Sequence, residues 1–342
     1  MNQRPIFCID FFEVKPMKNS MSAKVALAVL GMIILVLDTR TAVKGASEGI
    51  ASCISTVIPS LLPFIFLSCW LNGPAAGVGY RIPYGIAKIV GVPEGAGTIL
   101  ISAVLGGYPA GAQAVRAAYD NGCIRKTDAE RILAYCNNAG PAFIFGITGH
   151  LFSHPFAPWL LWSIHIISAF MVSLIFRPRG ESVCGDLIPA KHSGDMVLYT
   201  ARIMCTICVW VIIFRVLMAY LDVWIGTWMP TSVRAVLVGA LELVNGCCSL
   251  PQVTDARIRF VILSGMLAFG GVCVTMQTIS VLKGLSIRCY LKGKMMQTVF
   301  SIVLSVSLVY HQWYMLTVLL IPAIFFTVRN KNLGRNMQAI RV

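Results

Sequence analysis

The sequence has few charged residues. Asp, Glu, Lys and Arg make up only 12% of its 342 residues, whereas soluble domains carry roughly 25%. Hydrophobic residues reach 57%, and the mean hydropathy is +0.77. So little charge excludes an ordinary water-soluble core. Several windows supply the roughly 20 apolar residues that cross a bilayer, so we expect an all-α polytopic membrane protein whose main partner is the lipid bilayer.

Catalytic, cofactor and metal motifs are also missing. The chain has no HExxH, GxSxG or Walker A motif and no pair of carboxylates suited to hydrolysis. His150 and His154 are spaced like metal ligands, but Pro155 ends any helix there and no third ligand follows. We therefore predict no enzyme, no cofactor and no metal site.

The twelve cysteines form no disulfide framework. Most lie in apolar stretches, where a free cysteine behaves as a small hydrophobic residue. Cys205 and Cys208 form a CxxC pair inside an apolar stretch, and Cys247 is directly followed by Cys248. This pattern excludes a small secreted disulfide scaffold.

The charges that are present are mostly positive, with 28 Lys and Arg against 14 Asp and Glu. The cations gather in the loops 178–196 and 284–294, the latter including Lys294, and in the tail 329–342. Three connections carry no Lys or Arg: 150–155, 222–232 and 311–312. The positive-inside rule then places both termini in the cytoplasm. It also explains the net charge of +14 without a nucleic-acid partner.

About eight stretches are predicted to span the membrane, and two further apolar stretches are interrupted by glycine. The predicted spans are 22–38, 49–71, 132–149, 156–177, 197–221, 233–250, 295–310 and 313–328. The interrupted stretches are 94–120 and 259–283. Because basic residues flank them, the charge count makes both re-entrant, entering and leaving on the cytoplasmic side. Such backbone is tolerated at membrane depth only beside protein or a water-filled cavity.

The chain divides into two similar halves around the basic loop. We predict these segments: N-terminal cytoplasmic segment 1–21, first transmembrane helix and connection 22–48, first repeat 49–177, cytoplasmic loop 178–196, second repeat 197–310, last transmembrane helix 311–328 and cytoplasmic tail 329–342. The interrupted stretches resemble each other, since Gly106-Gly107 aligns with Gly270-Gly271 and Gln113 aligns with Gln277. Chance similarity of two apolar segments is the alternative.

The first interrupted stretch contains a predicted helix break at Gly106, Gly107, Tyr108 and Pro109. Glycine permits positive φ and proline removes an amide hydrogen, so a continuous helix should stop here. A break exposes backbone carbonyls and a half-helix N-terminus, which suits an anionic or dipolar solute. The alternative is a kinked helix that packs closely through small residues.

A second break follows Asn137 and Asn138, at Gly140 and Pro141. Two adjacent amides in hydrocarbon are costly unless they are hydrogen-bonded. One interpretation is that they bind a polar solute or the Gly107 loop. The other is that they cap the end of a helix, since asparagine tolerates left-handed geometry.

The second half carries a carboxylate, Glu242, inside an apolar segment. An ionisable residue in a membrane segment marks a functional site by default. It would serve as a solute ligand, a cation ligand or a proton carrier; the alternative is a structural pair with Arg202 or Arg215. Asn245 falls on the same helical face, and Gln277 is a weaker candidate of the same kind.

Five segments in order carry a family resemblance: VIPSLLPFIFLS (57–68), GGYPAGA (106–112), DAERILAYCNNAGPAFIFG (128–146), LELVNG (241–246) and FGGVCVTMQ (269–277). Over residues 50–300 the chain resembles the membrane proteins with nucleoside recognition, or Gate, domains. Among these it is most similar to the YlbJ-like sporulation integral membrane proteins of spore-forming Firmicutes.

The resemblance implies a bacterial cytoplasmic membrane protein with two Gate-like repeats and a role in forming heat-resistant spores. In outline it implies similarity to nucleoside permeases and the gate region of ferrous-iron transporters, without making nucleosides the substrate. It assigns to the first motif Gly107, Tyr108, Pro109, Asn137, Asn138, Gly140 and Pro141, and to the second Glu242, Gly270, Gly271 and Gln277. Where many relatives have Ser or Thr, this chain has Cys136 and Ala139, which weakens the case for a hydroxyl ligand.

We therefore expect a solute transporter or channel-like protein that binds a small polar solute between the two glycine-broken segments. The alternative is a non-transporting membrane scaffold for spore morphogenesis, and homo-oligomerisation is left open. The charge pattern conflicts with an inverted repeat. The charge map opens both re-entrant segments toward the cytoplasm, whereas an inverted repeat opens them on opposite sides, which indicates an error among the predicted spans.

Overall fold

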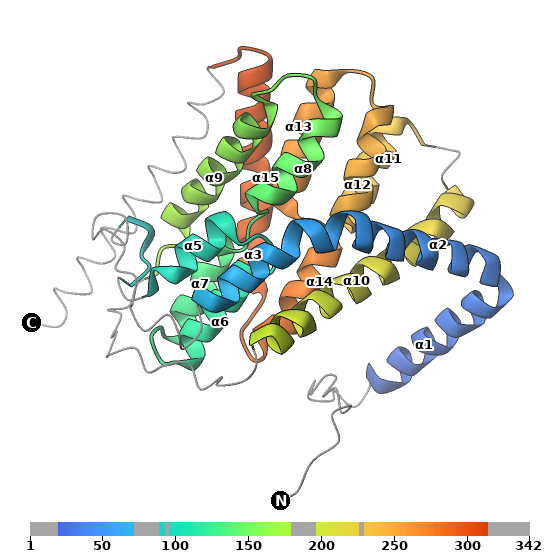
Figure 1. Cartoon of the computed structure of the whole chain (residues 1–342), viewed down its shortest axis with the longest axis horizontal. Coiled ribbons are helices and arrows are strands. Elements are labelled where there is room, and N and C mark those ends of the chain that lie inside the picture. Colours follow the sequence, from blue (N-terminus) through green and yellow to red (C-terminus); the bar gives the residue numbers. More distant parts are fainter. Residues whose placement is uncertain (1–19, 72–88, 94–95, 179–195, 226–228, 314–342) are drawn as a thin grey trace, which may run out of the picture.

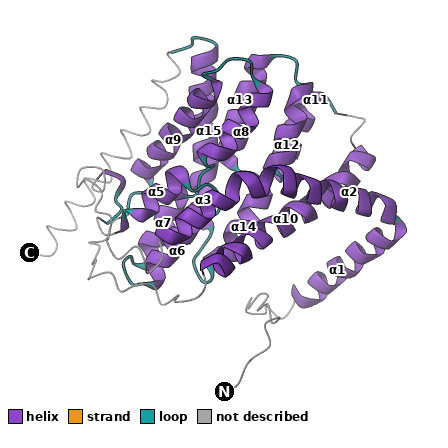
Figure 2. Ribbon diagram, in the orientation of Figure 1, coloured by secondary structure: helices purple, strands orange, loops and turns teal. Residues whose placement is uncertain are grey.

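A computed structural model describes residues 20–71, 89–93, 96–178, 196–225 and 229–313. All regular elements in these ranges are helices (Figure 2). Four helices there are long and apolar enough to cross a membrane: Thr39–Trp70, Ala157–Ile175, Met196–Trp224 and Ala256–Leu282. The chain is therefore a multi-pass α-helical membrane protein. The predicted span 313–328 and the tail 329–342 lie outside the described ranges, except for residue 313.

The first half contains a long helix, a hairpin, a broken helix and a continuous helix (Figure 1). Its elements are α1 (Ser20–Leu37), α2 (Thr39–Ser52), a π-helical turn (Cys53–Val57), α3 (Ile58–Leu71), α5 (Thr98–Leu105), α6 (Ala110–Asp120), α7 (Lys126–Cys136), α8 (Pro141–Leu151) and α9 (Ala157–Ile175). Because the π turn connects α2 directly to α3, these segments form one long helix.

The second half has the same order of elements. They are α10 (Met196–Ile225), α11 (Thr231–Leu241), α12 (Leu243–Ser249), a 3₁₀ turn (Leu250–Gln252), α13 (Ala256–Phe269), α14 (Gly271–Leu282) and α15 (Arg288–Val309). Helix α10 packs along α2. Glycine allows this close approach, since a Cβ on Gly49 would lie 2.9 Å from the Cα of Ile212.

Two groups of polar contacts define opposite ends of the bundle. At the Glu130 end, the Ser286 amide donates to the Glu130 carboxylate at 2.9 Å, and Arg131 Nη1 donates to the Arg177 carbonyl at 3.3 Å. These contacts join the start of α7, the end of α9 and the start of α15. At the Arg259 end, Arg259 Nη1 donates to the carbonyl of Leu151 at 2.7 Å, which joins the end of α8 to the start of α13.

Segment 259–283 crosses between these ends, so its re-entrant interpretation is wrong. Helix α13 starts at the Arg259 end, and α14 finishes at the Glu130 end, where Arg116 Nη1 donates to the Leu282 carbonyl at 3.1 Å. The two helices follow one another across the bundle (Figure 1). Gly270 and Gly271 interrupt them, with φ of +80° and +84°, and these two left-handed glycines break the helix without reversing the chain.

Two helix pairs do reverse direction. Helix α5 packs against α6 with its tip at Gly106–Pro109, and α11 packs against α12 with its tip at Glu242. The predicted continuous span 233–250 is therefore wrong, because Glu242 has extended backbone and starts a new helix. The predicted span 132–149 is also interrupted, at Asn137–Gly140.

The alignment of the two Gly-Gly pairs does not hold in three dimensions. Gly106 and Gly107 lie at the tip of a hairpin, whereas Gly270 and Gly271 join the two parts of a crossing helix. The hairpin tip that matches Gly107 in the order of elements is the one at Glu242. The sequence likeness thus paired segments of different structural kinds.

Candidate functional site

The two hairpin tips and the two helix joints meet at the centre of the bundle. A Cβ on Gly140 would lie 3.0 Å from the Cα of Gly107, so the first tip rests on the α7–α8 joint. A Cβ on Gly271 would lie 3.1 Å from the carbonyl oxygen of Gly239, so the second tip rests on the α13–α14 joint. At both places glycine permits backbone to contact backbone.

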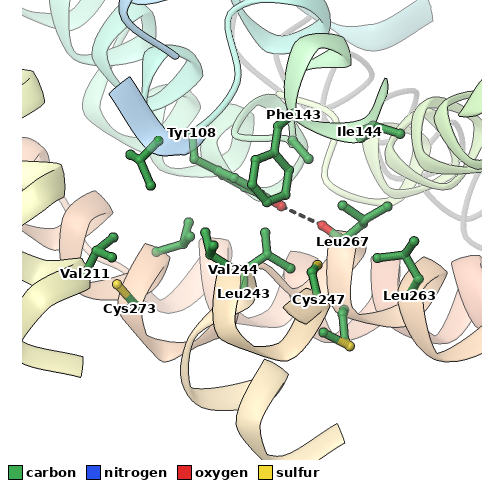
Figure 3. Close-up of a cluster of buried hydrophobic side chains, with 14 of the residues drawn as sticks. Tyr108, Phe143, Ile144, Val211, Leu243, Val244, Cys247, Leu263, Leu267 and Cys273 are labelled. Atoms are coloured by element: carbon green, nitrogen blue, oxygen red, sulfur yellow. Dashed lines mark hydrogen bonds between the residues drawn. The ribbon is translucent and has the colours of Figure 1, made fainter. Parts of the chain in front are cut away.

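Tyr108 connects the first hairpin tip to the second half. Gly107 has φ of +72°, and Tyr108 follows it, with its ring buried. Its hydroxyl donates a 2.7 Å hydrogen bond to the carbonyl of Leu267, in the last turn of α13 (Figure 3). The last carbonyls of a helix lack partners within the helix, so Tyr108 supplies the donor that Leu267 needs.

A small cavity of about 40 Å³ lies where these elements converge. Four of the predicted site residues line it: Tyr108, Gly140, Glu242 and Gln277. Apolar side chains from α3, α10 and α14 complete the wall, among them Leu61, Val211 and Val274. A water molecule needs roughly 10–15 Å³ of such volume, so this cavity has room for a few waters.

Glu242 is the acidic member of this central cavity. It is 2% exposed, and its carboxylate accepts hydrogen bonds from the amides of Val244 at 3.0 Å and Asn245 at 2.7 Å. These bonds make it the N-cap of α12. Arg215 instead pairs with Glu48, and Arg202 is exposed, so the structural pairing of Glu242 with either arginine is wrong.

The two asparagines at the α7–α8 joint point away from the central cavity. Asn137 Nδ2 donates to Thr278 Oγ1 at 2.9 Å, and Asn138 Nδ2 donates to the Tyr135 carbonyl at 2.7 Å. Neither side chain lines the cavity. Asn138 thus caps the end of α7, through its side chain rather than through left-handed backbone. Asn137 Oδ1 is buried without a partner among the described residues.

A buried lysine, Lys294, contacts the side chain of Asn138. Lys294 is 1% exposed, and its Nζ donates to Asn138 Oδ1 at 3.2 Å and to Gln297 Oε1 at 2.8 Å. Nζ also lies 5.2 Å from the centre of the Tyr108 ring. No ion pair in the described ranges includes Lys294. Because an ammonium beside neutral amides is costly to bury, this residue is a functional candidate.

The sequence interpretation missed Lys294 because it assigned residues 284–294 to a cytoplasmic loop. Helix α15 begins at Arg288, so Lys294 lies well inside it. A usable signal existed: polar residues recur at helical spacing along this segment and are all buried, namely Lys294, Gln297, Ser301 and Ser305. In an apolar helix such a stripe marks the face that turns toward the protein interior.

His165 extends the polar cluster into α9. Its Nε2 accepts a 3.0 Å hydrogen bond from the Ala139 amide, and its backbone carbonyl accepts one from Gln297 Nε2 at 3.3 Å. The remaining ring nitrogen, Nδ1, is buried without a partner among the described residues. The α7–α8 joint is thus held by hydrogen bonds from α9 and α15.

Among the other predicted residues, Pro109 and Asn245 do not line the central cavity, whereas Gln277 does. Pro109 is the N-cap of α6. Gln277 Nε2 donates a 3.4 Å hydrogen bond to the sulfur of Cys273. The side chain of Asn245 lines a different cavity, between α10, α11 and α12. No cluster of three or more His, Cys, Asp or Glu side chains suited to a metal ion occurs in the described part of the chain.

Comparisons with known proteins agree with a membrane role. The chain is 29% identical over 170 residues to a protein of Bacillus subtilis (strain 168) named sporulation integral membrane protein YlbJ. The match covers 47% of this chain and 42% of that relative, so the chain spans under half the length of its relative. No protein-family model matches the chain, and no solved structure matches it significantly.

Proposed function

We propose that this multi-pass membrane protein is a solute transporter or channel-like protein, and not an enzyme, whose site is the central cavity. One observation carries the proposal: both hairpin tips, the α7–α8 joint and helix α14 line a cavity that holds the buried Glu242 carboxylate. Broken helices that meet at mid-membrane supply backbone and side-chain ligands for polar solutes. A purely structural bundle has no need of four helix breaks at one place.

The cavity represents a closed state in this proposal. At about 40 Å³ it is too small for a nucleoside, since ligand pockets typically enclose about 300–1,000 Å³. Binding a larger solute requires one hairpin tip to move away from the joint on which it rests. Glycine-to-glycine contacts such as Gly107 to Gly140 make such a movement feasible, because no side chains interlock there.

We propose that the two halves form an inverted repeat of Gate-like type, covering the segments 49–177 and 197–310. Each half has a long helix, a hairpin, a broken helix and a continuous helix in the same order. Hairpin α5–α6 has its ends near the Glu130 end, and α11–α12 opens toward the Arg259 end. In this arrangement the two hairpins open on opposite sides, as an inverted repeat requires.

The Glu130 end faces the cytoplasm in this proposal. It carries Arg125, Lys126, Arg131, Lys283 and Arg288. At the other end the connections 150–155 and 311–312 have no Lys or Arg, although Arg257 and Arg259 lie at the start of α13. The positive-inside rule assigns such ends to the cytoplasm and the exterior, respectively. The membrane is then the bacterial cytoplasmic membrane, with the 178–196 loop inside.

The relative from Bacillus subtilis is named for sporulation, so we place the proposed transport activity in spore formation. Two variants test this role: Glu242→Gln, which keeps a capping oxygen but loses the charge, and Asn138→Ala, which removes an acceptor of Lys294. Cells that carry either variant as their only copy should produce the protein in the membrane but form spores with reduced heat resistance. Full resistance with both variants would overturn the proposal.

The alternative function is a scaffold that recruits partners during spore morphogenesis. A scaffold depends on surfaces outside the bilayer, such as the basic tail 329–342, whereas a transporter depends on its cavity. Deleting residues 329–342 separates the two: normal spores with the deletion and defective spores with Glu242→Gln favour transport. The reverse result favours the scaffold.

A further inference from the structure

A second cavity, separate from the central one, lies between α10, α11 and α12 and measures about 200 Å³. We refer to it as the outer cavity, because it lies on the side of the α11–α12 hairpin that faces away from the centre. Its wall is mostly polar: Arg215, Asp222, Arg234, Asn245, Ser249 and Gln252. A water molecule needs roughly 10–15 Å³ of such volume, so a small solute fits here.

Two arginines of this wall are each held by one carboxylate. Arg234 Nη2 lies 2.6 Å from Asp222 Oδ1, and Arg215 Nη2 pairs with Glu48. A guanidinium carries five N–H donors, and each of these ion pairs engages a single terminal nitrogen. The carboxylates therefore balance the charges of the arginines but leave most of their donors unoccupied.

Two residues of the outer cavity's wall carry buried donor atoms that lack hydrogen-bond partners. Arg234 Nε and Asn245 Nδ2 are both buried without a hydrogen-bond partner among the described residues, and Asn245 is only 6% exposed. No buried side-chain acceptor of the described cavity wall is in the same position. Unpaired buried donors are costly, about 1–3 kcal/mol each. The missing partner is therefore a group that presents acceptors.

We propose that the outer cavity binds a small oxyanion, a carboxylate or a phosphate, whose oxygens accept hydrogen bonds from Arg234 and Asn245. Guanidinium donors match the oxygen spacing of both groups. Because Asp222 and Glu48 already balance the charge, selectivity comes from the direction of the donors. A spherical anion such as chloride should bind poorly for that reason.

The outer cavity lies next to the central cavity, which connects this inference with the proposed transport function. Helix α12 separates the two cavities: Val244 lines the central cavity, whereas Asn245, the next residue, lines the outer one. An oxyanion bound beside Asn245 is thus one side chain away from the central cavity. The passage of the solute rests on the proposed function, but its binding to the outer cavity does not.

Thermal unfolding of the full-length protein in detergent tests binding, because a ligand of the folded state raises the midpoint. The probes are sodium acetate and inorganic phosphate, with acetamide and sodium chloride as controls at matched ionic strength. The inference predicts that acetate, phosphate or both raise the midpoint and that neither control does. Acetate alone indicates a carboxylate solute, and phosphate alone indicates a phosphate solute. No shift with either oxyanion, or equal shifts with chloride, would overturn the inference.

Substitutions locate the bound oxyanion. Arg234→Lys keeps the positive charge beside Asp222 but loses the Nε donor. Asn245→Leu removes the side-chain amide but keeps the backbone N–H that donates a hydrogen bond to the Glu242 carboxylate. Arg116→Lys is the matched control, since Arg116 has a similar pair with Asp120 at the opposite end. Either outer-cavity variant should weaken oxyanion binding about tenfold, as expected for one lost charge-assisted bond, and the control should not.

Either of the two outer-cavity variants tests the inference if the other fails to fold. If Arg234→Lys fails to fold, Asn245→Leu gives the same answer, because it leaves both ion pairs of the cavity intact. Binding unchanged in the variant that folds would overturn the inference. Oxyanion binding that persists in Glu242→Gln and is lost in Arg234→Lys supports the outer cavity, whether or not the protein transports.

Discussion

The hydroxyl of Tyr108 donates a 2.7 Å hydrogen bond to the carbonyl oxygen of Leu267, 159 positions further along the chain. The bond joins the tip of the first hairpin to the last turn of α13, so it connects the two halves directly (Figure 3). The ring of the same tyrosine lines the central cavity, and its centre lies 5.2 Å from Lys294 Nζ. Tyr108 therefore connects the central cavity to the end of α13 and to the buried lysine.

Removing this hydroxyl should destabilise the closed arrangement. Tyr108→Phe keeps the ring but leaves the buried Leu267 carbonyl without its donor, which costs about 1–3 kcal/mol. Thermal unfolding of the purified protein should show a lower midpoint than wild type. Tyr119→Phe is the control, because Tyr119 is half-buried in the same hairpin and its ring contacts Arg116. An equal midpoint for Tyr108→Phe and wild type would show that the bond contributes nothing.

Replacing Lys294 should have the opposite effect on stability. Lys294→Met removes a buried ammonium that has no carboxylate partner, and Asn138 Oδ1 keeps its 3.1 Å bond from Gln297. The substitution removes the cost of burying a charge that has no ionic partner, and we expect this gain to exceed the loss of about 1–3 kcal/mol that follows when Gln297 Oε1 loses its donor. The unfolding midpoint should therefore rise, while the function that depends on the cavity is lost.

Lys292→Met is the matched control for Lys294, since Lys292 is exposed on the same helix. Exposed substitutions usually change stability by less than about 0.5 kcal/mol. A fall in the midpoint for Lys294→Met would contradict our interpretation. It would mean that the ammonium stabilises the fold, for example by its position beside the end of α7.

The contact between α6 and α7 should not tolerate a methyl group. A Cβ on Gly111 would lie 1.7 Å from the carbonyl oxygen of Cys136, so Gly111→Ala forces the helices apart. Overpacking costs about 1–3 kcal/mol or more, and a lower unfolding midpoint or lost expression should result. Gly146→Ala is the control, because no atom lies within 4 Å there; it should be stabilising by roughly 0.5–1 kcal/mol. Similar midpoints for the two variants would refute the contact.

The sequence predicted the helix breaks better than the path of the chain between them. Gly106–Pro109 and Gly140-Pro141 interrupt helices because local backbone chemistry decides there, and that chemistry can be read from residue type. Whether the chain reverses after a break depends on contacts with distant segments. The crossing at Gly270 and the reversal at Glu242 were both predicted wrongly for that reason.

The candidate site was only partly predictable. Glu242 and Gln277 could be selected because polar side chains in apolar segments are conspicuous, and both line the central cavity. Asn138 was also selected, but its partner is Lys294, which the charge count placed in a loop. Counting charges assumes that cations avoid the interior. That assumption fails at Lys294, whose buried Nζ donates to the amide oxygens of Asn138 and Gln297.

Ligand-induced stabilisation tests most directly whether the central cavity is a solute site. Purified wild-type protein and the variants Glu242→Gln and Gln277→Leu are unfolded thermally with nucleosides, divalent metal ions and small anions, and Arg234→Lys is carried in parallel to identify binding at the outer cavity. Our account predicts that at least one solute class raises the midpoint of the wild type and of Arg234→Lys but not of the two central-cavity variants. No shift with any class, or equal shifts in all four proteins, would contradict it.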